Sequence, residues 1–248
     1  MNILLAGATG QMGQVVSQVI ENSEHQIVAG FAHNTDSNFS YPIYQNIADI
    51  SESFDVIIDF SIPETLPELL AFAKSKKVGM VIASTGHEEE NIAKIHEAAQ
   101  EIPILFSGNL SLGINVMEMV AEKLAQALAE FDIEIIEKHH RYKRDAPSGT
   151  AKMLFEAVNK GRGEKLIEVD GRSGVIEGRD PNEVGVASLR GGSIVGEHSV
   201  LFAGEDEVVE IKHTASSKKI FAHGAVKAAA FVLTKENGLY TMSEVLES

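Results

Sequence analysis

The sequence predicts an α/β protein, in which a Rossmann-type parallel sheet is followed by a smaller α+β domain with a mostly antiparallel sheet. Two observations favour the parallel sheet: short apolar runs alternate with helical patterns over residues 2–106, and a glycine-rich turn follows the first run. A third observation favours the second sheet, because three strand-like runs joined by short turns occupy residues 184–213. At 248 residues the chain can form one large domain or two modest ones, with ample length for a packed core.

Composition and charge narrow the class of protein further. The chain is 44% hydrophobic and 23% charged, as ordinary globular proteins are. Its net charge of −15 disfavours nucleic acid as a partner, and the absence of cysteine excludes disulfides and thiolate metal sites. The first residues enter a strand without a basic leader, and no apolar run approaches the roughly 20 residues that span a bilayer. We therefore expect a cytoplasmic protein without a membrane partner.

The first strand, residues 2–6, leads directly into a glycine-rich turn and a helix over residues 14–22. The turn reads Gly7-Ala8-Thr9-Gly10-Gln11-Met12-Gly13. Glycines without Cβ atoms let backbone N–H groups approach a pyrophosphate at a helix start. A plain βα turn is the simpler alternative, but the strand and helix on either side favour a nucleotide site. We expect the first six of these residues to bind the cofactor.

The second strand, residues 26–31, ends where many NAD-binding units carry an acidic residue for the ribose. This chain has Ala32, His33 and Asn34 there, and its next carboxylate is Asp36. Ala32 can neither accept the ribose hydroxyls nor repel a 2′-phosphate. His33 can donate to that phosphate but lacks the fixed fork of arginine. We therefore expect NADPH and NADH both to be used, with a lean towards NADPH that grows as the pH falls.

The next strands are predicted at residues 55–60, 78–83 and 103–106, after a loop over residues 41–53 with a short helix near Ile47. Helices are predicted from Ser61 and over residues 88–100. Because ligands of parallel sheets bind at the carboxyl ends of the strands, two loops should line the nicotinamide half of the site. Their residues are Ala83, Ser84 and Thr85, and Ser107, Gly108, Asn109 and Leu110.

A long amphipathic helix over residues 111–130 leads into the second domain. We expect its apolar stripe to pack in a core; the stripe consists of Val116, Met119, Val120, Leu124 and Leu128. A strand over residues 131–137, a helix over 150–159, an exposed loop over 164–180 and strands at 184–190, 194–203 and 207–213 follow. A final helix, residues 218–233, follows serines that could cap it.

Residues 137–151 gather cationic and imidazole groups in an acidic chain. They read Glu-Lys-His-His-Arg-Tyr-Lys-Arg-Asp-Ala-Pro-Ser-Gly-Thr-Ala. A solvated basic loop before a capped helix is the simpler interpretation, but such a local excess of positive charge favours an anion or catalytic site. The helix start after Ser148 offers the N–H groups of Gly149 and Thr150 to a carboxylate.

This segment resembles the signature of the 4-hydroxy-tetrahydrodipicolinate reductase (dihydrodipicolinate reductase) family, and the resemblance extends towards both ends of the chain. It implies NAD(P)H-dependent reduction of a cyclic unsaturated imine dicarboxylate in the diaminopimelate route to lysine. It also implies that His139 donates the proton, that Lys143 assists, and that His140 binds substrate. Loops 83–86 and 107–110 resemble the family's cofactor loops. The family often has an acidic residue and an arginine where Ala32 and His33 stand.

The resemblance further implies that the final helix returns to the nucleotide domain. That domain would comprise residues 1–110 and 216–248, and a substrate-binding and oligomerisation domain would comprise residues 111–215. Hinges would lie near residues 109–111 and 215–217, and closure would exclude water. A homotetramer is implied as well.

Other interpretations remain open at this point. A metal site at His139 and His140 is disfavoured because neighbouring residues of a strand point apart. Lys218 stands where the family often has an arginine, and His198 and His213 could both be structural. A non-catalytic sensor of nucleotide and dicarboxylate would use the same glycine turn without a poised acid. A dehydrogenase acting on another small dicarboxylate is the third hypothesis.

Overall fold

The computed structural model describes residues 1–35, 39–175 and 178–248 and divides the chain into two compact units. The first unit comprises residues 1–112 and 218–248, and the second comprises residues 113–217. Asp36 lies outside the described residues. None of the helices within the described ranges is long and apolar enough to cross a membrane.

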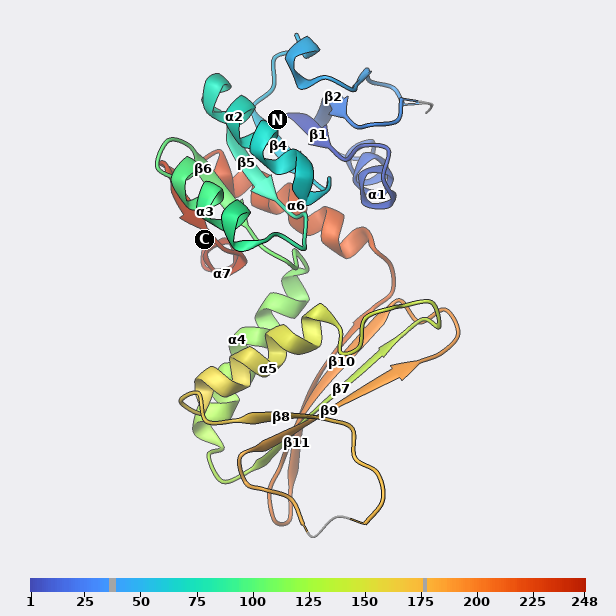
Figure 1. Cartoon of the computed structure of the whole chain (residues 1–248), viewed down its shortest axis with the longest axis vertical. Helices are drawn as coiled ribbons and strands as arrows, with labels where there is room; N and C mark the ends of the chain where they lie inside the picture. The colour runs from blue at the N-terminus through green and yellow to red at the C-terminus, as the bar shows by residue number, and fades with distance from the viewer. Residues whose placement is uncertain (36–38, 176–177) are drawn as a thin grey trace. The chain divides into compact units, whose positions relative to one another are not determined.

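A seven-stranded parallel sheet forms the centre of the first unit, with the order β12-β6-β5-β4-β1-β2-β3 (Figure 1). Its strands are β1 (Asn2–Ala6), β2 (Gln26–Phe31), β3 (Ile43–Tyr44), β4 (Val56–Asp59), β5 (Gly79–Ile82), β6 (Pro103–Phe106) and β12 (Gly238–Tyr240). The strand order reverses beside β1, as in doubly wound folds, and such a switch point is where ligands bind.

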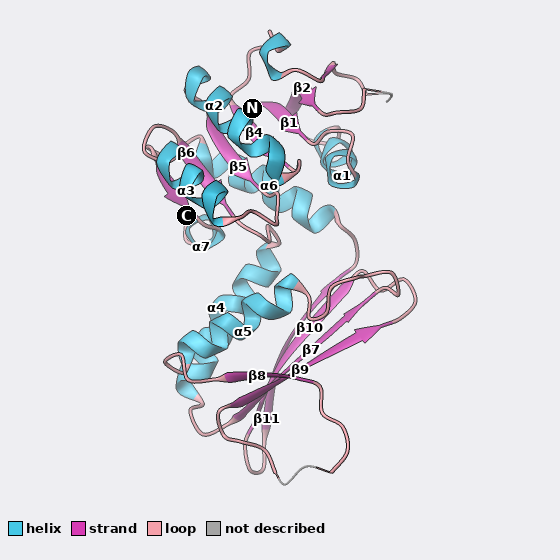
Figure 2. Ribbon diagram, in the orientation of Figure 1, coloured by secondary structure: helices cyan, strands magenta, loops and turns pink. Residues whose placement is uncertain are grey.

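Helices cover both faces of this sheet (Figure 2). They are α1 (Gln11–Ile20), the 3₁₀ helices η1 (Ile47–Asp49) and η2 (Pro63–Thr65), α2 (Leu66–Lys76), α3 (Glu89–Ala98), α6 (Lys219–Val232) and α7 (Met242–Leu246). Alternate residues of β1 face opposite sides: Ile3 and Leu5 pack with α1 and α6, whereas Leu4 and Ala6 pack with α2 and α3. The continuous apolar runs of the sequence thus reflect burial on both faces.

The second unit contains a five-stranded mixed sheet, with the order β11-β10-β7-β9-β8. Its strands are β7 (Asp132–His139), β8 (Ile167–Asp170), β9 (Glu183–Arg190), β10 (Gly196–Ala203) and β11 (Val208–Ala215). β10 is antiparallel to β7 and β11, and β9 is parallel to β7 and β8. Helices α4 (Leu112–Ala127) and α5 (Gly149–Gly161) cover one face, and the core there includes Ile133, Ile135, Leu154 and Phe202.

The predicted α/β fold with a second, smaller sheet is confirmed, but several local predictions are wrong. The predicted loop over residues 164–180 contains β8, and β12 was not foreseen. In α4 the buried residues are Ile114, Asn115, Met117, Ala121 and Ala125. Val116 and Val120 are 46% and 38% exposed and lie away from the core, whereas Leu124 and Leu128 of the predicted stripe pack against it. The N-cap residue of α6 is Lys218 rather than a serine.

Candidate active site

The turn between β1 and α1 fits a dinucleotide phosphate. Gly7 has φ 76°, and a Cβ there would collide with the backbone of Phe60 at the end of the neighbouring strand. Its N–H donates to the carbonyl of Phe31 at 2.8 Å, which fixes the turn against β2. Helix α1 then begins after Gly10 without a side-chain cap and without an acidic residue in its first turn. An uncapped, uncharged helix start beside a tight turn is suited to an anion.

A cavity of about 210 Å³ adjoins this turn and the end of β2. Its lining includes Gly7, Thr9, Gly10, Phe31, Ala32, His33, Asn34, Phe60, Ser61, Ile62 and Thr65. Ala32 is 8% exposed and its N–H donates to the carbonyl of Tyr44 at 3.0 Å, so β3 holds the end of β2 in place. The lining carries no carboxylate side chain among the residues described.

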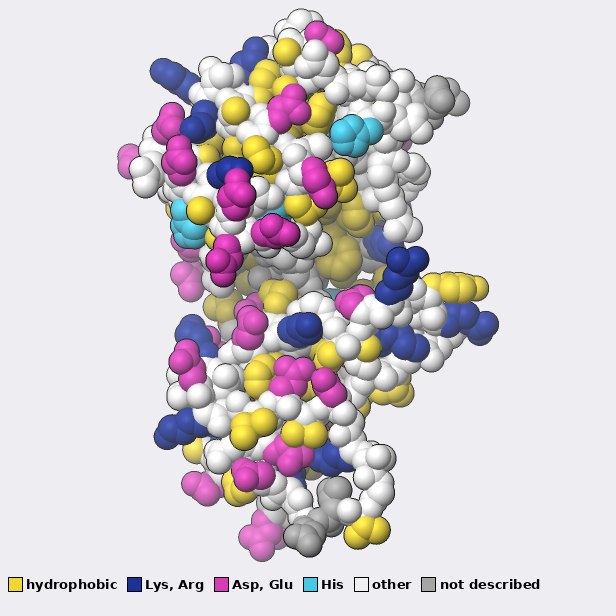
Figure 3. Space-filling model, in the orientation of Figure 1, with side chains coloured by type: hydrophobic (Ala, Val, Ile, Leu, Met, Phe, Trp, Pro, Cys, Tyr) yellow, Lys and Arg dark blue, Asp and Glu magenta, His cyan; other side chains and the backbone are white. Residues whose placement is uncertain are grey.

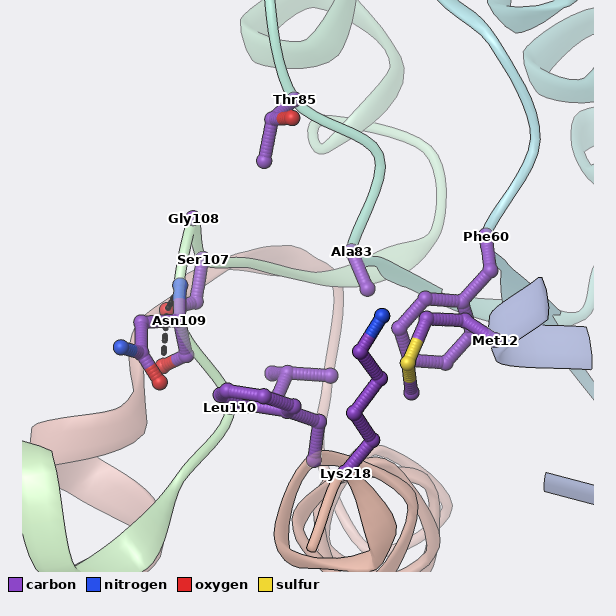
Figure 4. Close-up of a pocket in the computed structure, with 10 residues that line it drawn as sticks. Met12, Phe60, Ala83, Thr85, Ser107, Gly108, Asn109, Leu110 and Lys218 are labelled. Carbon is purple, nitrogen blue, oxygen red and sulfur yellow. Dashed lines mark hydrogen bonds between the residues drawn. The ribbon is translucent and has the colours of Figure 1, made fainter. Parts of the chain in front are cut away.

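A second cavity of about 290 Å³ lies at the carboxyl ends of β5 and β6 (Figure 4). It is lined by Met12, Phe60, Ala83, Thr85, Ser107, Gly108, Asn109, Leu110, Lys218 and Phe221. Figure 4 shows the amino group of Lys218 pointing towards Met12 and Ala83. That amino group donates to the side chain of Gln11 at 2.6 Å, which ties the chain before α6 to the glycine-rich turn.

A buried carboxylate joins the loops that form both cavities. Asp59 is fully buried and accepts hydrogen bonds from the N–H of Ser61 at 2.8 Å and from Ser84 Oγ at 2.6 Å. The hydroxyl of Ser61 also donates to it. Burial raises the pKa of Asp59, while these hydrogen bonds oppose the shift. Ser84 Oγ lies 3.0 Å from His87 Nε2, so the chain after β5 is held by a polar network.

Most of the residues predicted for the cofactor line these cavities, but three do not. Ala8 is fully buried in the core, Ser84 lies behind the cavity wall with 4% exposure, and Gln11 contacts Lys218. Sequence reasoning missed Phe60, Ser61, Ile62 and Thr65. The signal for them was available: they follow β4, which pairs with β1 in a parallel sheet and so ends beside the glycine turn.

In the second unit, β7 extends two residues further than predicted and includes His139. His139 is 9% exposed, and its Nδ1 lies 2.6 Å from the fully buried carboxylate of Glu137. Arg190 of β9 donates to both oxygens of that carboxylate at 2.7 Å, and the N–H of Ser148 donates at 3.2 Å. Burial would raise the pKa of Glu137, but hydrogen bonds from Arg190, His139 and Ser188 outweigh it and lower the pKa to about 2.

His198 of β10 packs against His139, with ring centroids 5.1 Å apart and an interplanar angle of 70°. Its Nε2 lies 3.0 Å from Ser148 Oγ. Burial lowers the pKa of His198 to about 4, so this ring is neutral near pH 7. Burial also lowers the pKa of His139, although the hydrogen bond and charge of Glu137 oppose that shift. Sequence reasoning assigned no role to His198, and alternation along β10 was the only signal for its buried position.

His140 and Lys143 lie in the loop after β7. The ring of His140 faces Tyr142, with centroids 6.5 Å apart, while that of His139 faces His198. The two adjacent imidazoles therefore have different surroundings. Lys143 Nζ donates to both carboxylate oxygens of Asp145 at 2.8 and 2.9 Å. In Figure 3, Lys and Arg side chains gather on the second unit at the end of the sheet from which this loop projects.

Helix α5 begins at Gly149 directly after this loop. Ser148 is its N-cap residue, and Ser148 Oγ accepts from the N–H of Ala151 at 3.2 Å. A Cβ at Gly149 would meet no heavy atom within 4 Å, so the space beside this helix start is open. Thr150 is the second helical residue and is partly exposed. The helix start can therefore receive a carboxylate, while His139 and Lys143 supply groups able to move a proton.

Within the described ranges, no group of three or more His, Asp or Glu side chains is arranged to hold a metal ion. The imidazole of His139 is instead engaged with a carboxylate that is itself clamped by an arginine.

Comparison with known proteins relates the whole chain to one family. The family model "Dihydrodipicolinate reductase, N-terminus" matches residues 1–110, and "Dihydrodipicolinate reductase, C-terminus" matches residues 113–246. A 4-hydroxy-tetrahydrodipicolinate reductase of Caldanaerobacter subterraneus subsp. tengcongensis is 45% identical over 100% of this chain and 98% of its own length. The enzyme of the same name from Clostridium novyi is 43% identical over 99% and 98%.

Solved structures agree on the fold. A dipicolinate-bound dihydrodipicolinate reductase from Paenisporosarcina sp. TG-14 superposes with a TM-score of 0.81 over 97% of each chain, at 23% identity. The diaminopimelate dehydrogenase of C. glutamicum superposes with a TM-score of 0.59 over 100% of this chain and 93% of its own, at 16% identity. The first unit is thus a Rossmann domain of the kind that binds nicotinamide nucleotides. The chain belongs to the dihydrodipicolinate reductase family, an oxidoreductase family of lysine biosynthesis.

Proposed function

We propose that this chain reduces 4-hydroxy-tetrahydrodipicolinate to tetrahydrodipicolinate in the diaminopimelate pathway, with NADPH or NADH as the reductant. Full-length relatedness to enzymes of that name supports the reaction. The observation in the second unit that carries the proposal is local: a buried imidazole, a lysine and the open start of a helix occur within residues 139–150. These are the groups that protonation and dicarboxylate binding require.

Nucleotide binding is assigned to residues 1–110 and 216–248. The reduced nicotinamide supplies the hydride, because no side chain can do so. The glycine turn would hold the pyrophosphate, the lining beside Ala32 and His33 would hold the adenosine ribose, and the lining beside Ala83 and Asn109 would hold the nicotinamide. Their lining residues, which join the turn to the ends of β2, β5 and β6, support this assignment.

Substrate binding and protonation are assigned to residues 111–215. His139 is proposed to donate its proton to the ring carbon next to the hydride acceptor. The Nε2–H bond breaks, the electron pair of the reduced enamine forms the new C–H bond, and a neutral imidazole remains. Lys143 assists by stabilising the electron-rich ring, His140 binds substrate, and the N–H groups of Gly149 and Thr150 receive one carboxylate. Pyridine-2,6-dicarboxylate bound to the structural relative supports a dicarboxylate of this size.

Both nucleotides are proposed to serve, with a lean towards NADPH. The described lining beside the end of β2 carries no carboxylate, so nothing described there repels a 2′-phosphate. His33 lies in the same lining, where a ring N–H can donate a hydrogen bond to a 2′-phosphate. This donor supports the lean towards NADPH.

A homotetramer is proposed as the working assembly. The face of the second sheet that α4 and α5 leave uncovered includes Leu189 of β9, which is 46% exposed, and the edge strand β11 begins with Val208, 60% exposed. Burying these exposed apolar side chains against another copy of the chain would be favourable, which supports the proposal. Light scattering of the purified protein measures the assembly directly.

The decisive test is loss of absorbance of reduced nicotinamide when the product of the preceding synthase is added to the enzyme. A reductase consumes the nucleotide, and His139→Gln protein slows the loss. A sensor of the same two ligands would bind both in calorimetry and leave the absorbance constant. A dehydrogenase of another small dicarboxylate would consume nucleotide only with that other compound.

A further inference from the structure

We infer that Glu137 is the residue that positions the proton-donating histidine, and that Arg190 holds the Glu137 carboxylate in place for this purpose. The inference rests on the proposed role of His139 and adds two residues to which neither the sequence nor the family resemblance assigned a part.

The geometry fixes the orientation of the His139 ring. An ionised carboxylate can only accept hydrogen bonds, so the 2.6 Å contact with Glu137 places a proton on Nδ1. The nitrogen left for the substrate is then Nε2. A Cβ at Gly196 would lie 3.2 Å from Nε2, so this edge of the ring lies over backbone without a side chain. Proton donation through Nε2 needs this tautomer and this orientation.

Three elements converge on the Glu137 carboxylate. His139 and Glu137 lie two residues apart on the same face of β7, where they contact each other. Arg190 donates to both carboxylate oxygens from β9, and the Ser148 N–H donates to one of them from the start of α5. Arg190 also donates to the carbonyl of Asp145, within the loop that carries Lys143. A carboxylate with no exposed surface needs hydrogen-bond donors, and three elements supply them here.

The charged groups around His139 oppose one another. Glu137 on its own strand favours the protonated imidazole, whereas Arg190 from β9 and Lys143 from the loop disfavour it. His198 from β10 packs on the ring and stays neutral near pH 7, and His213 lies opposite His198 on β11. Burial lowers the pKa of His139, and Glu137 limits that shift. Glu137 therefore lets His139 keep its proton to a higher pH than burial alone would allow.

Substitutions of Glu137 and Arg190 should shift the pKa of His139 in opposite directions. Replacing Glu137 by glutamine removes a negative charge and should lower the pKa of His139. Replacing Arg190 by glutamine removes a positive charge and should raise it. Histidine labelled with ¹³C at Cε1 allows the ring to be titrated by NMR, with the His139→Gln spectrum identifying its signal. Each unit of pKa changes the protonated fraction about tenfold once the pH lies above the pKa.

Glu134→Gln is the matched control. Glu134 lies on the other face of the same strand and is also paired with arginines, since Arg172 donates to both its oxygens at 2.8 and 2.9 Å. Losing this pair should leave the His139 titration and the pH dependence of kcat unchanged. Should Glu137→Gln fail to fold, Arg190→Gln and Arg190→Lys still report the sign of the shift.

The expected result is a His139 titration that moves to lower pH in Glu137→Gln and to higher pH in Arg190→Gln, with the alkaline limb of kcat moving in the same directions. Turnover of Glu137→Gln at pH 7 should fall tenfold or more, and nucleotide affinity should not change. Shifts of the same sign in both variants, or no shift in either, would overturn the inference. Opposite NMR shifts without a moved rate limb would support the positioning by Glu137 and refute His139 as the acid.

Discussion

Ser148 Oγ lies 3.0 Å from His198 Nε2 and 3.2 Å from the backbone nitrogen of Ala151, so one hydroxyl joins β10 to the start of α5. Ser148 is 2% exposed and His198 is 4% exposed. A helix cap and a buried imidazole therefore share a partner, and removing it affects both.

Ser148→Ala should lower the free energy of unfolding by about 2–4 kcal/mol, which combines a lost cap with a buried imidazole nitrogen left without its partner. Thr241→Ala is the control, because Thr241 caps α7 in the first unit without a buried histidine. It should cost only about 1 kcal/mol. Urea titrations of both variants measure the two costs, and equal losses would show that the contact with His198 contributes nothing.

His139→Gln and Lys143→Ala should each reduce turnover by about 10²–10⁴, the usual contribution of a positioned acid. Affinity for the reduced nucleotide should barely change, because the cavities assigned to it lie in the first unit. His96→Gln, an exposed histidine of α3, controls for the loss of an imidazole. Steady-state assays and fluorescence titration give the two quantities. Near-normal turnover in both variants would refute the assignment.

Gly149→Val should weaken pyridine-2,6-dicarboxylate about tenfold or more as an inhibitor, while Gly149→Ala weakens it less. The protein itself has room for the side chain, since a Cβ there meets nothing within 4 Å. The added atoms would instead occupy the space of a carboxylate at the start of α5. Inhibition constants against substrate and against nucleotide measure the effect. An inhibitor that competes only with the nucleotide would move the dicarboxylate away from this helix.

Ala32→Glu should shift preference towards NADH by about 2 kcal/mol, or roughly thirtyfold, the scale of one charged hydrogen bond gained or lost. The new carboxylate would stand in the lining that now contains Ala32, His33 and Asn34. Ratios of kcat/KM for the two nucleotides at pH 6 and pH 8 measure both this shift and the wild-type preference. A wild-type preference for NADH of a hundredfold would contradict the proposal.

The depressed pKa of Glu137 predicts a loss of stability in acid. Its folded-state pKa is about 2, against an ordinary value of 4.5. A carboxylate whose pKa is lower in the folded state stabilises the fold at a pH above its unfolded-state pKa. This stabilisation is lost as the pH falls through its folded-state pKa. Glu137→Gln should therefore be less stable than wild type by about 3 kcal/mol near pH 6, and the gap should narrow steadily below pH 4.5. Urea titrations at several pH values test this, and a constant gap would contradict it.

Sequence patterns sufficed for the features that depend on neighbours along the chain. The glycine turn, the alternation of strands with helices and the helix start at Gly149 are of this kind. What they could not supply were contacts between distant residues. Glu137 in a strand pattern resembles a solvent-facing residue until Arg190, 53 positions later, is placed beside it. β12 escaped notice because three residues with intermediate burial carry almost no periodicity.

The strand order of the first unit has a consequence for synthesis on the ribosome. One face of that sheet, which includes Ile3, Leu5 and Val81, is covered partly by α1; the rest of its cover is α6, and β6 gains its outer neighbour only in β12. Both elements are translated after the entire second unit, residues 113–217. Until α6 and β12 are synthesised, the nascent first unit therefore has a partly uncovered apolar face and an open strand edge, although the second unit has been translated completely. Such an intermediate would be an obvious client for chaperones.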